Sequence, residues 1–248
     1  MSTKAVLLVA DISGFTKFMR QHAVATSHAK QIIVRLLKAL MHVAEAPLKI
    51  AELEGDAVFF YAASEGGEEV AATAARVKNQ VINFFSTFNK EVEEINRLQT
   101  CSCDACDQVS ALKLKQVLHV GNVEVEQIER FEKLFGVDVI LVHRMLKNTL
   151  PSREYVMMSA PMYDAFGGFF DLEPERRKER FEGLGEVDVL VFYPQRIAKN
   201  WQPETEQPSR PSLLHRMAWR FRISVTFMLE LLGSRRSHPA KGNLSKKI

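Results

Sequence analysis

Two aspartates occupy positions where a turn would present them to a ligand. Asp11 directly follows the apolar run 5–10, and Asp56 lies in the turn of the string ELEGDAV at 52–58. If the strand before Asp11 lies beside the hairpin around Gly55, the two carboxylates converge. A carboxylate pair of this kind can hold one or two divalent cations. The alternative is that both are ordinary turn residues, one capping a helix and the other in a hairpin.

The segment after Asp11 adds a second chemistry. A buried strand that ends in a glycine turn and continues as a helix directs backbone N–H groups toward an incoming anion, which suits phosphate oxygens. The residues concerned are Ser13, Gly14, Phe15 and Thr16. The turn after Asp11 is therefore a natural binding place for phosphate oxygens.

All three cysteines of the chain, Cys101, Cys103 and Cys106, lie within six residues. Three thiolates could bind Zn²⁺ or an iron–sulfur cluster if a fourth ligand came from Asp107, His119 or another subunit. The same thiols could instead sense redox state, and the plainest alternative is a loop of reduced thiols. An odd number of cysteines does not suit a secreted disulfide framework.

Both strands and helices are needed to position these residues. Apolar spacing predicts strands at 5–10, 48–54, 56–62, 155–159 and 187–192, a strand pair turning at Gly121 within 112–125, and helices at 16–46, 68–98, 137–146 and 162–166. This order favours an α+β sandwich, ferredoxin-like, with helices on one face of a mixed sheet. We expect one domain over 1–195, a proline-containing linker over 196–212 and an appendage over 213–248.

The composition is that of a globular protein, with 248 residues of which 46% are hydrophobic and 25% charged. This argues against disordered, collagen-like and low-complexity chains. The formal net charge of +3 hides a division. Residues 210–248 carry nine of the 33 Lys and Arg but one of the 30 acids, which gives +8 there and −5 in the rest.

The basic appendage contains a helical stripe of apolar residues, including Trp219, Phe221 and Phe227. Such a helix could contact an anionic membrane surface peripherally, or its apolar face could pack on the body or on a second subunit. No recognised nucleic-acid module accompanies it, so no specific nucleic-acid partner is expected. No signal peptide or membrane span is evident, which predicts a cytoplasmic protein.

Four strings resemble the class III nucleotidyl cyclases, the homology domain of adenylate and guanylate cyclases. LVADISGFT at 8–16 is similar to the first metal motif of that family, and GDAV at 55–58 to the second. HVG at 119–121 resembles the strand that follows the long helix. GVDVILVHRM at 136–145 resembles the helix that carries transition-state groups. The resemblance extends over about residues 1–195.

The resemblance implies a site at the interface of a head-to-tail dimer, a homodimer or a heterodimer with another cyclase-like chain. Asp11, Asp56 and the Ile12 carbonyl match the ligands of two Mg²⁺ or Mn²⁺ ions. The amides of 13–16 match the seat of the terminal phosphates of a nucleoside triphosphate. Glu52 matches the base-reading position, and Arg144 matches the arginine that stabilises charge on the transferring phosphorus.

Three positions depart from the family pattern. Ile140 stands where an asparagine orients the ribose, and Leu184, in the string EGLG at 182–185, aligns with a phosphate-binding lysine. The partner position of Glu52 aligns with Lys133, which fits neither the adenylate nor the guanylate pattern.

Two functions follow. The first is a divergent nucleotidyl cyclase that forms a cyclic nucleotide and pyrophosphate. The second is a catalytically degenerate cyclase-homology domain that binds nucleotide or metal as a regulatory module. The metal motifs favour the first function, whereas Ile140 and Leu184 favour the second.

Overall fold

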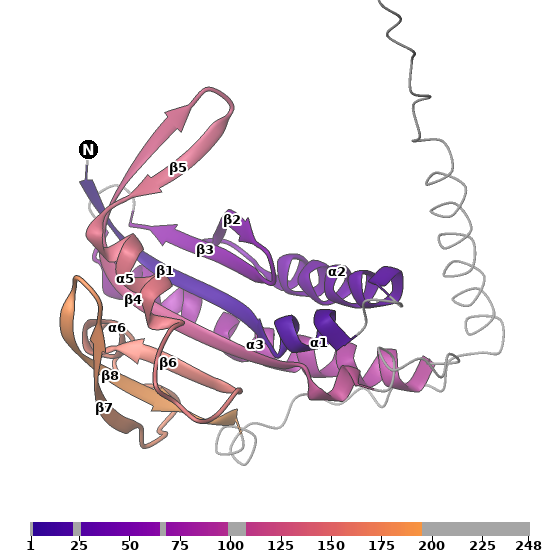
Figure 1. The fold of residues 1–248 in the computed structure, drawn as a ribbon. Coiled ribbons are helices and arrows are strands. Elements are labelled where there is room, and N and C mark those ends of the chain that lie inside the picture. The colour runs from indigo at the N-terminus through magenta and orange to yellow at the C-terminus, as the bar shows by residue number, and fades with distance from the viewer. Residues whose placement is uncertain (1, 22–25, 65–67, 99–107, 195–248) are drawn as a thin grey trace, which may run out of the picture.

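The computed structural model describes residues 2–21, 26–64, 68–98 and 108–194 (Figure 1). Its centre is an eight-stranded mixed sheet in the order β2-β3-β1-β4-β6-β8-β7, with β5 paired to β4. The β4–β6 pair is parallel and the other pairs are antiparallel. The strands are β1 (Ser2–Ser13), β2 (Lys49–Glu54), β3 (Ala57–Ala63), β4 (Lys113–Ile128), β5 (Phe131–Phe135), β6 (Tyr155–Ser159), β7 (Glu175–Phe181) and β8 (Gly185–Phe192).

The helices are α1 (Phe15–Gln21), α2 (Thr26–Val43), α3 (Val70–Leu98), α5 (Val137–Met145) and α6 (Ala160–Ala165), with a short 3₁₀ turn, η1 (Val109–Ala111). The predicted helix over 16–46 is therefore two helices, and residues 22–25 between them lie outside the described residues. The α+β class and the ferredoxin-like start, with β1 between β3 and β4, are confirmed.

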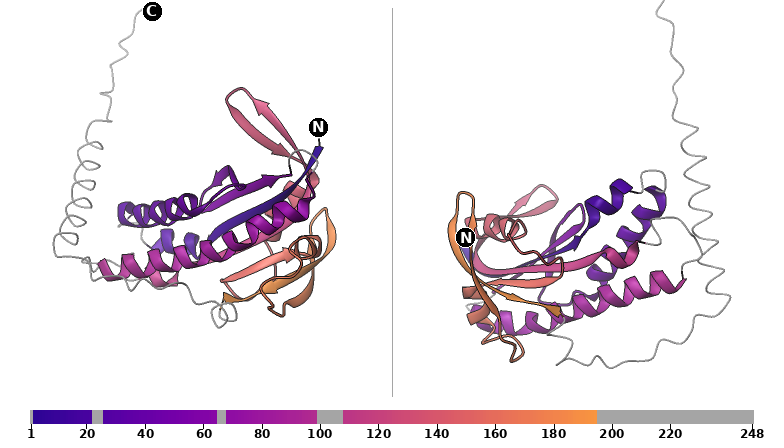
Figure 2. Two further views of the ribbon diagram at one scale, coloured as in Figure 1. Left: turned by 180° about the vertical axis from the view of Figure 1, so that it is seen from behind. Right: turned by 60° about the horizontal axis from the view of Figure 1, so that its bottom comes forward.

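The sheet has a core on each face, because successive residues of β1 point to opposite sides. Val6, Leu8 and Ala10 pack with apolar side chains of α1, α2, α3 and α6. Leu7 and Val9 pack on the other face with Leu141, Val142 and Met145 of α5. The prediction that all helices cover one face was wrong for α5, which stands apart from the long pair α2 and α3 (Figures 1 and 2).

The segment around Gly121 was also predicted wrongly, because it does not turn. β4 runs through it without interruption and turns back only after Ile128 to pair with β5. A side chain at Gly121 would place its Cβ 2.2 Å from the carboxyl carbon of Asp138 in α5. The glycine therefore allows α5 to pack closely on β4. The β4–β5 hairpin, which lies further along β4, projects from the body (Figure 1).

No sequence pattern predicts β7, because its string ERRKERF lacks apolar alternation. It is an edge strand paired only with β8 along the sheet path, and charged residues are frequent on exposed edges. Among the described residues, no helix combines the length and the apolarity needed to cross a lipid bilayer. Cys101, Cys103 and Cys106, the predicted linker and the predicted amphipathic helix lie outside the described residues.

Candidate functional site

Asp11 and Asp56 come together at one end of the sheet. Asp11 is near the end of β1 and lies opposite Ala57, the first residue of β3, in the antiparallel register. The Ile12 N–H donates to the backbone carbonyl of Asp56 at 3.1 Å, which fixes the β2–β3 turn against β1. We call this pair the carboxylate site. The convergence that the sequence predicted from two separate turns is therefore present.

Lys115 of β4 completes the immediate surroundings of Asp11. It lies opposite Asp11 in the β1–β4 register, and its Nζ is 3.0 Å from Asp11 Oδ2. The side chains of Lys115 and Asp11 are 20% and 15% exposed, so water screens this pair less than it screens a surface pair. One positive charge therefore stands against two carboxylates.

Burial, and to a smaller extent the charge of Asp11, raise the pKa of Asp56 from 3.8 to about 6. A hydrogen bond to the backbone and the charge of Lys115 oppose this shift without cancelling it. A second acid that is costly to ionise beside a first is the arrangement that a bound cation relieves.

The donor set is one of hard oxygen atoms, which suits Mg²⁺ or Mn²⁺. Two carboxylates and the nearby Ile12 carbonyl are available for a cation. Among the described residues, no cluster of three or more His, Cys, Asp or Glu side chains could hold a metal alone. A cation here would thus complete its shell with backbone, water or substrate oxygens, as Mg²⁺ commonly does.

The turn after Asp11 has the geometry that the sequence predicted. Ser13 ends β1 and is buried, Gly14 has a φ of +94°, and Phe15 and Thr16 begin α1. The positive φ favours glycine because a Cβ would be strained in this conformation. The Phe18 N–H donates to the Gly14 carbonyl at 2.9 Å, which closes the first helical turn.

A cavity of about 290 Å³ lies among α5, β5 and the strands β2 and β3. Glu52, Lys133, Ile140, His143 and Arg144 line it, together with Ala51, Glu54, Phe59, Glu132, Leu134 and Val139. We call it the α5 pocket. It contains the predicted base-reading and transition-state residues but neither Asp11 nor Asp56.

Three pairs of side chains hold the polar groups of the α5 pocket, and two of them are ion pairs. Lys133 Nζ lies 2.5 Å from Glu52 Oε2, across the gap between β5 and β2. His143 Nδ1 lies 3.2 Å from Glu54 Oε2, and its ring packs edge-on against Phe59 with the centroids 4.7 Å apart.

Arg144 forms the third pair. Its Nη1 lies 3.0 Å from Oε2 of Glu182, in the β7–β8 turn. Ile140 is 51% exposed beside this pocket, and Leu184 packs at the edge of the core on the α5 side of the sheet. Ile140 and Leu184, two of the three positions that depart from the cyclase pattern, therefore offer no polar group here, and the third, Lys133, is paired with Glu52.

A buried polar chain sets the position of α5. His119 Nε2 donates to Asp138 Oδ1 at 3.0 Å, and the other Asp138 oxygen accepts the Asn122 N–H at 2.6 Å. On its far side, His119 Nδ1 shares a 2.7 Å hydrogen bond with the buried hydroxyl of Ser159. This chain ties the first turn of α5 to β4 and β6, so it fixes where His143 and Arg144 stand.

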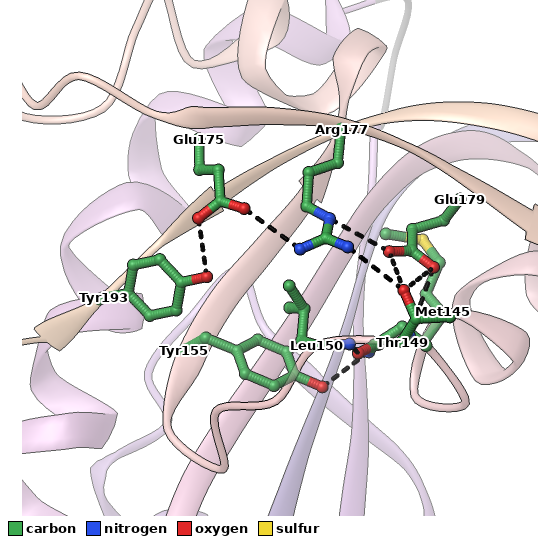
Figure 3. A network of polar contacts seen from close by, with 9 residues as sticks. Met145, Thr149, Leu150, Tyr155, Glu175, Arg177, Glu179 and Tyr193 are labelled. Atoms are coloured by element: carbon green, nitrogen blue, oxygen red, sulfur yellow. Dashed lines mark hydrogen bonds and ion pairs between the residues drawn. The ribbon is translucent and has the colours of Figure 1, made fainter.

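Another polar network lies between Tyr155 of β6 and the charged residues of β7 (Figure 3). Tyr155 lies beside Lys115 in the β4–β6 register. Its hydroxyl accepts a hydrogen bond from Asn148 Nδ2 at 2.7 Å. Burial raises the pKa of Tyr155 to about 12, with smaller increases from the charges of Asp11 and Glu179, so this phenol stays protonated at neutral pH.

Sequence reasoning missed Lys115, His143 and Glu54. No local motif marks them, since Lys115 meets Asp11 through strand register and His143 meets Glu54 through the packing of α5 on β3. The alternation of β4 could have placed Lys115 on one face, but not opposite Asp11.

Comparison with known proteins places the chain in a family. Residues 33–155 match the family model described as "Protein of unknown function (DUF2652)". An uncharacterized protein of Mycobacterium tuberculosis, Rv2561/Rv2562, is 35% identical over 157 residues, which are 63% of this chain and 71% of that protein. The chain belongs to this family.

Solved structures identify the fold of this DUF2652 member. The adenylyl cyclase CyaB from P. aeruginosa is 16% identical and superposes with a TM-score of 0.58 over 77% of this chain and 95% of its own. A class III adenylyl cyclase-like ATP-binding protein from Pseudomonas aeruginosa is 19% identical, with a TM-score of 0.55 over 66% and 35%. The DUF2652 member thus has the class III nucleotidyl cyclase fold, in divergent form.

Proposed function

We propose that this protein is a divergent class III nucleotidyl cyclase, converting a nucleoside triphosphate into a cyclic nucleotide and pyrophosphate. The observation that carries the proposal is the carboxylate site. Asp11 and Asp56 are brought together from separate turns, and the pKa of Asp56 is raised to about 6 by burial and by Asp11. Charges arranged at this cost are characteristic of functional sites.

The chemistry follows from the groups present. The 3′-oxygen of the ribose bonds to the α-phosphorus, the bond from that phosphorus to the bridging oxygen breaks, and the hydroxyl proton leaves to solvent. Asp11, Asp56 and the Ile12 carbonyl would hold Mg²⁺ or Mn²⁺, which would neutralise phosphate charge. The backbone of 13–16 would face the terminal phosphates, and Arg144 would stabilise charge on the α-phosphate.

The arrangement of the two regions supports a dimer. Within one chain, the α5 pocket with Glu52, Lys133 and Arg144 does not include the carboxylate site. A head-to-tail dimer, with an identical or a cyclase-like chain, would bring the carboxylate site of one protomer to the α5 pocket of the other. Exposed apolar side chains beside the pocket, Leu53, Phe135, Val137 and Ile140, are consistent with such a contact.

The second candidate is a regulatory domain that binds nucleotide or metal without turnover. Ile140 favours it, because an apolar side chain in the α5 pocket offers no hydrogen bond to a ribose. The likeness to a cyclase-like protein described as ATP-binding is compatible with it. Cytoplasmic location, peripheral membrane contact by the C-terminal segment, and Zn²⁺ or an iron–sulfur cluster at Cys101, Cys103 and Cys106 remain predictions.

One experiment separates the candidates. Full-length protein is incubated with ATP, GTP, CTP or UTP and Mn²⁺ or Mg²⁺, and the products are identified by mass spectrometry. An Asp11→Asn, Asp56→Asn variant is compared with Asp164→Asn, which removes an exposed acid from α6. Cyclic product from the wild type and the Asp164 variant only supports the cyclase. Nucleotide binding by calorimetry without product from any nucleotide contradicts it and supports the regulatory domain.

A further inference from the structure

A loop between α5 and β6 brings an arginine to the turn after the carboxylate site. Arg153 Nη1 lies 3.9 Å from the position that a Cβ on Gly14 would take. Gly14 is three residues after Asp11, so the guanidinium stands beside the same strand end. Within the described ranges, no carboxylate pairs with Arg153, and its side chain is exposed. Its five N–H donors are therefore available to a ligand.

Strand register adds a second cation at this place. Lys113 of β4 lies opposite Ser13, and Lys115 lies opposite Asp11. Alternate residues of a strand share a face, so Lys113 and Lys115 lie on the face that carries Asp11. Lys115 is paired with Asp11, whereas Lys113 has no ion-pair partner in the part of the chain that the structure describes.

The loop that carries Arg153 is held by contacts that do not use Arg153. Thr149 Oγ1 donates to Glu179 Oε1 at 2.8 Å, and its N–H reaches Oε2 of the same carboxylate at 3.3 Å (Figure 3). Glu179 is only 3% exposed and is also 3.4 Å from Arg177 Nε. Removing a partner from a buried, paired carboxylate is costly, so the contact between Thr149 and Glu179 holds the loop in place.

Two more contacts stiffen the loop. Asn148 bonds Tyr155 with its amide nitrogen and accepts the Leu150 N–H at 3.1 Å. Ser152 Oγ donates to the Glu154 carbonyl at 3.0 Å and accepts the Glu154 N–H at 3.2 Å. Residues on both sides of Arg153 are thus fixed. The backbone that carries Arg153 is therefore already ordered, and binding an anion would restrict only its side chain.

We infer that Arg153, assisted by Lys113, binds the terminal phosphates of the nucleoside triphosphate from the same chain that supplies Asp11 and Asp56. The inference rests on the proposed function for the identity of the ligand. Arg153 would supply the positive charge that the family has as a lysine at the position of Leu184. In this chain the β7–β8 turn has no lysine there, and its Glu182 pairs with Arg144. Arginine suits this role because its planar fork matches phosphate oxygens in pairs.

Inorganic triphosphate with Mg²⁺ tests the inference without a base or a reaction. Its affinity for full-length protein is measured by calorimetry for wild type, Arg153→Gln and Arg153→Lys. The control is Arg130→Gln, which removes the same charge from the far end of β4, in the β4–β5 turn. We expect Arg153→Gln to weaken binding about tenfold or more, as for a charge-assisted hydrogen bond. Arg153→Lys should fall between, and Arg130→Gln should stay within about twofold.

The positioning network has its own test. Thr149→Val should weaken triphosphate binding in the wild type but add nothing in the Arg153→Gln background, because the loop acts through Arg153. Thermal unfolding checks that Arg153→Gln stays folded, as expected for a side chain that is exposed. An additive effect of Thr149→Val contradicts the positioning role.

Two results overturn the inference: no binding of triphosphate by the wild type, or equal affinity in Arg153→Gln and Arg130→Gln. Its failure is distinct from failure of the proposed function. If the wild type forms cyclic product while Arg153→Gln keeps its triphosphate affinity, the cyclase stands and this inference falls. If triphosphate binding depends on Arg153 but no nucleotide is cyclised, this inference stands and the cyclase falls.

Discussion

The carboxylate site and the α5 pocket hold their charges in opposite ways. At the carboxylate site, two acids face one lysine on the central strands β1, β3 and β4. In the α5 pocket, each basic side chain already has an acid partner: Lys133 with Glu52, His143 with Glu54 and Arg144 with Glu182. At the carboxylate site the two acids outnumber the lysine that pairs with them, whereas in the α5 pocket every basic side chain is matched by an acid and Glu132 adds a further carboxylate.

This difference indicates how each region would meet a ligand. The backbone of the carboxylate site is rigid, because strands fix it on both sides. A bound cation would stabilise it by neutralising its two acids. The α5 pocket must exchange partners instead. Its ion pairs are partly exposed, and pairs of that kind contribute only about 0–1 kcal/mol, so a ligand can displace them.

The largest expected effect is on the carboxylate site. Asp11→Asn with Asp56→Asn should lower cyclic product formation at least about 10³-fold, because preorganised charge stabilisation of the transition state is lost. Product is quantified by mass spectrometry at saturating Mn²⁺. Activity equal to that of Asp164→Asn would mean that the two carboxylates have no part in the reaction.

A substitution at Gly121 of β4 would disturb the α5 pocket without changing a residue of the carboxylate site. Gly121→Ala should destabilise the fold by about 2–3 kcal/mol, because its Cβ would overlap Asp138 and push α5 from β4. Chemical denaturation measures the change in free energy of unfolding. Gly167→Ala is the control, since nothing lies within 4 Å of a Cβ there, although its φ of +61° adds some strain.

The response of Gly121→Ala to metal completes that comparison. The rise in melting temperature on adding Mn²⁺ should persist, because the carboxylate site does not depend on α5. Loss of that rise would show that the two regions are coupled within one chain.

A smaller effect, on the choice of nucleotide base, is expected from the Lys133–Glu52 ion pair of the α5 pocket. Glu52→Gln should change the affinity for one nucleoside triphosphate relative to the other three by about tenfold, because one charge-assisted hydrogen bond to the base is weakened. Inorganic triphosphate should bind unchanged, since it has no base. Calorimetry with all five ligands checks both statements, and a uniform change across them would remove Glu52 from base recognition.

The smallest expected effect is on stability without metal. Asp56→Asn should raise the free energy of unfolding at pH 7 by about 1 kcal/mol after allowance for solvent screening, because it removes a half-buried charge beside Asp11. Stabilisation by removal of a site residue is a known trade-off. Denaturation in EDTA and in Mn²⁺ tests it, and the variant should gain less from Mn²⁺ than the wild type. A destabilised variant in EDTA would contradict the excess of negative charge.

Much of the fold could be predicted because local patterns were strong. The apolar run in β1, the hairpin at Gly55 and the long amphipathic α3 each appear in the sequence as one periodic segment. β7 could not be predicted, since its stability comes from pairing with β8 and not from its own charged string. Gly121 was misread because a glycine that permits close packing resembles one that permits a turn.

The sequence alone determined the chemistry available: two turn aspartates, a glycine turn, a glutamate and an arginine, in motifs that resemble those of class III cyclases. Types and spacing of residues along the chain carry that information.

Only the tertiary structure decided which charges meet. Strand register places Lys115 on Asp11, helix packing places His143 on Glu54, and a loop closed by Glu179 places Arg153 beside Gly14. These contacts join residues far apart in sequence. Their electrostatic energy depends on distance and burial, which no local pattern contains.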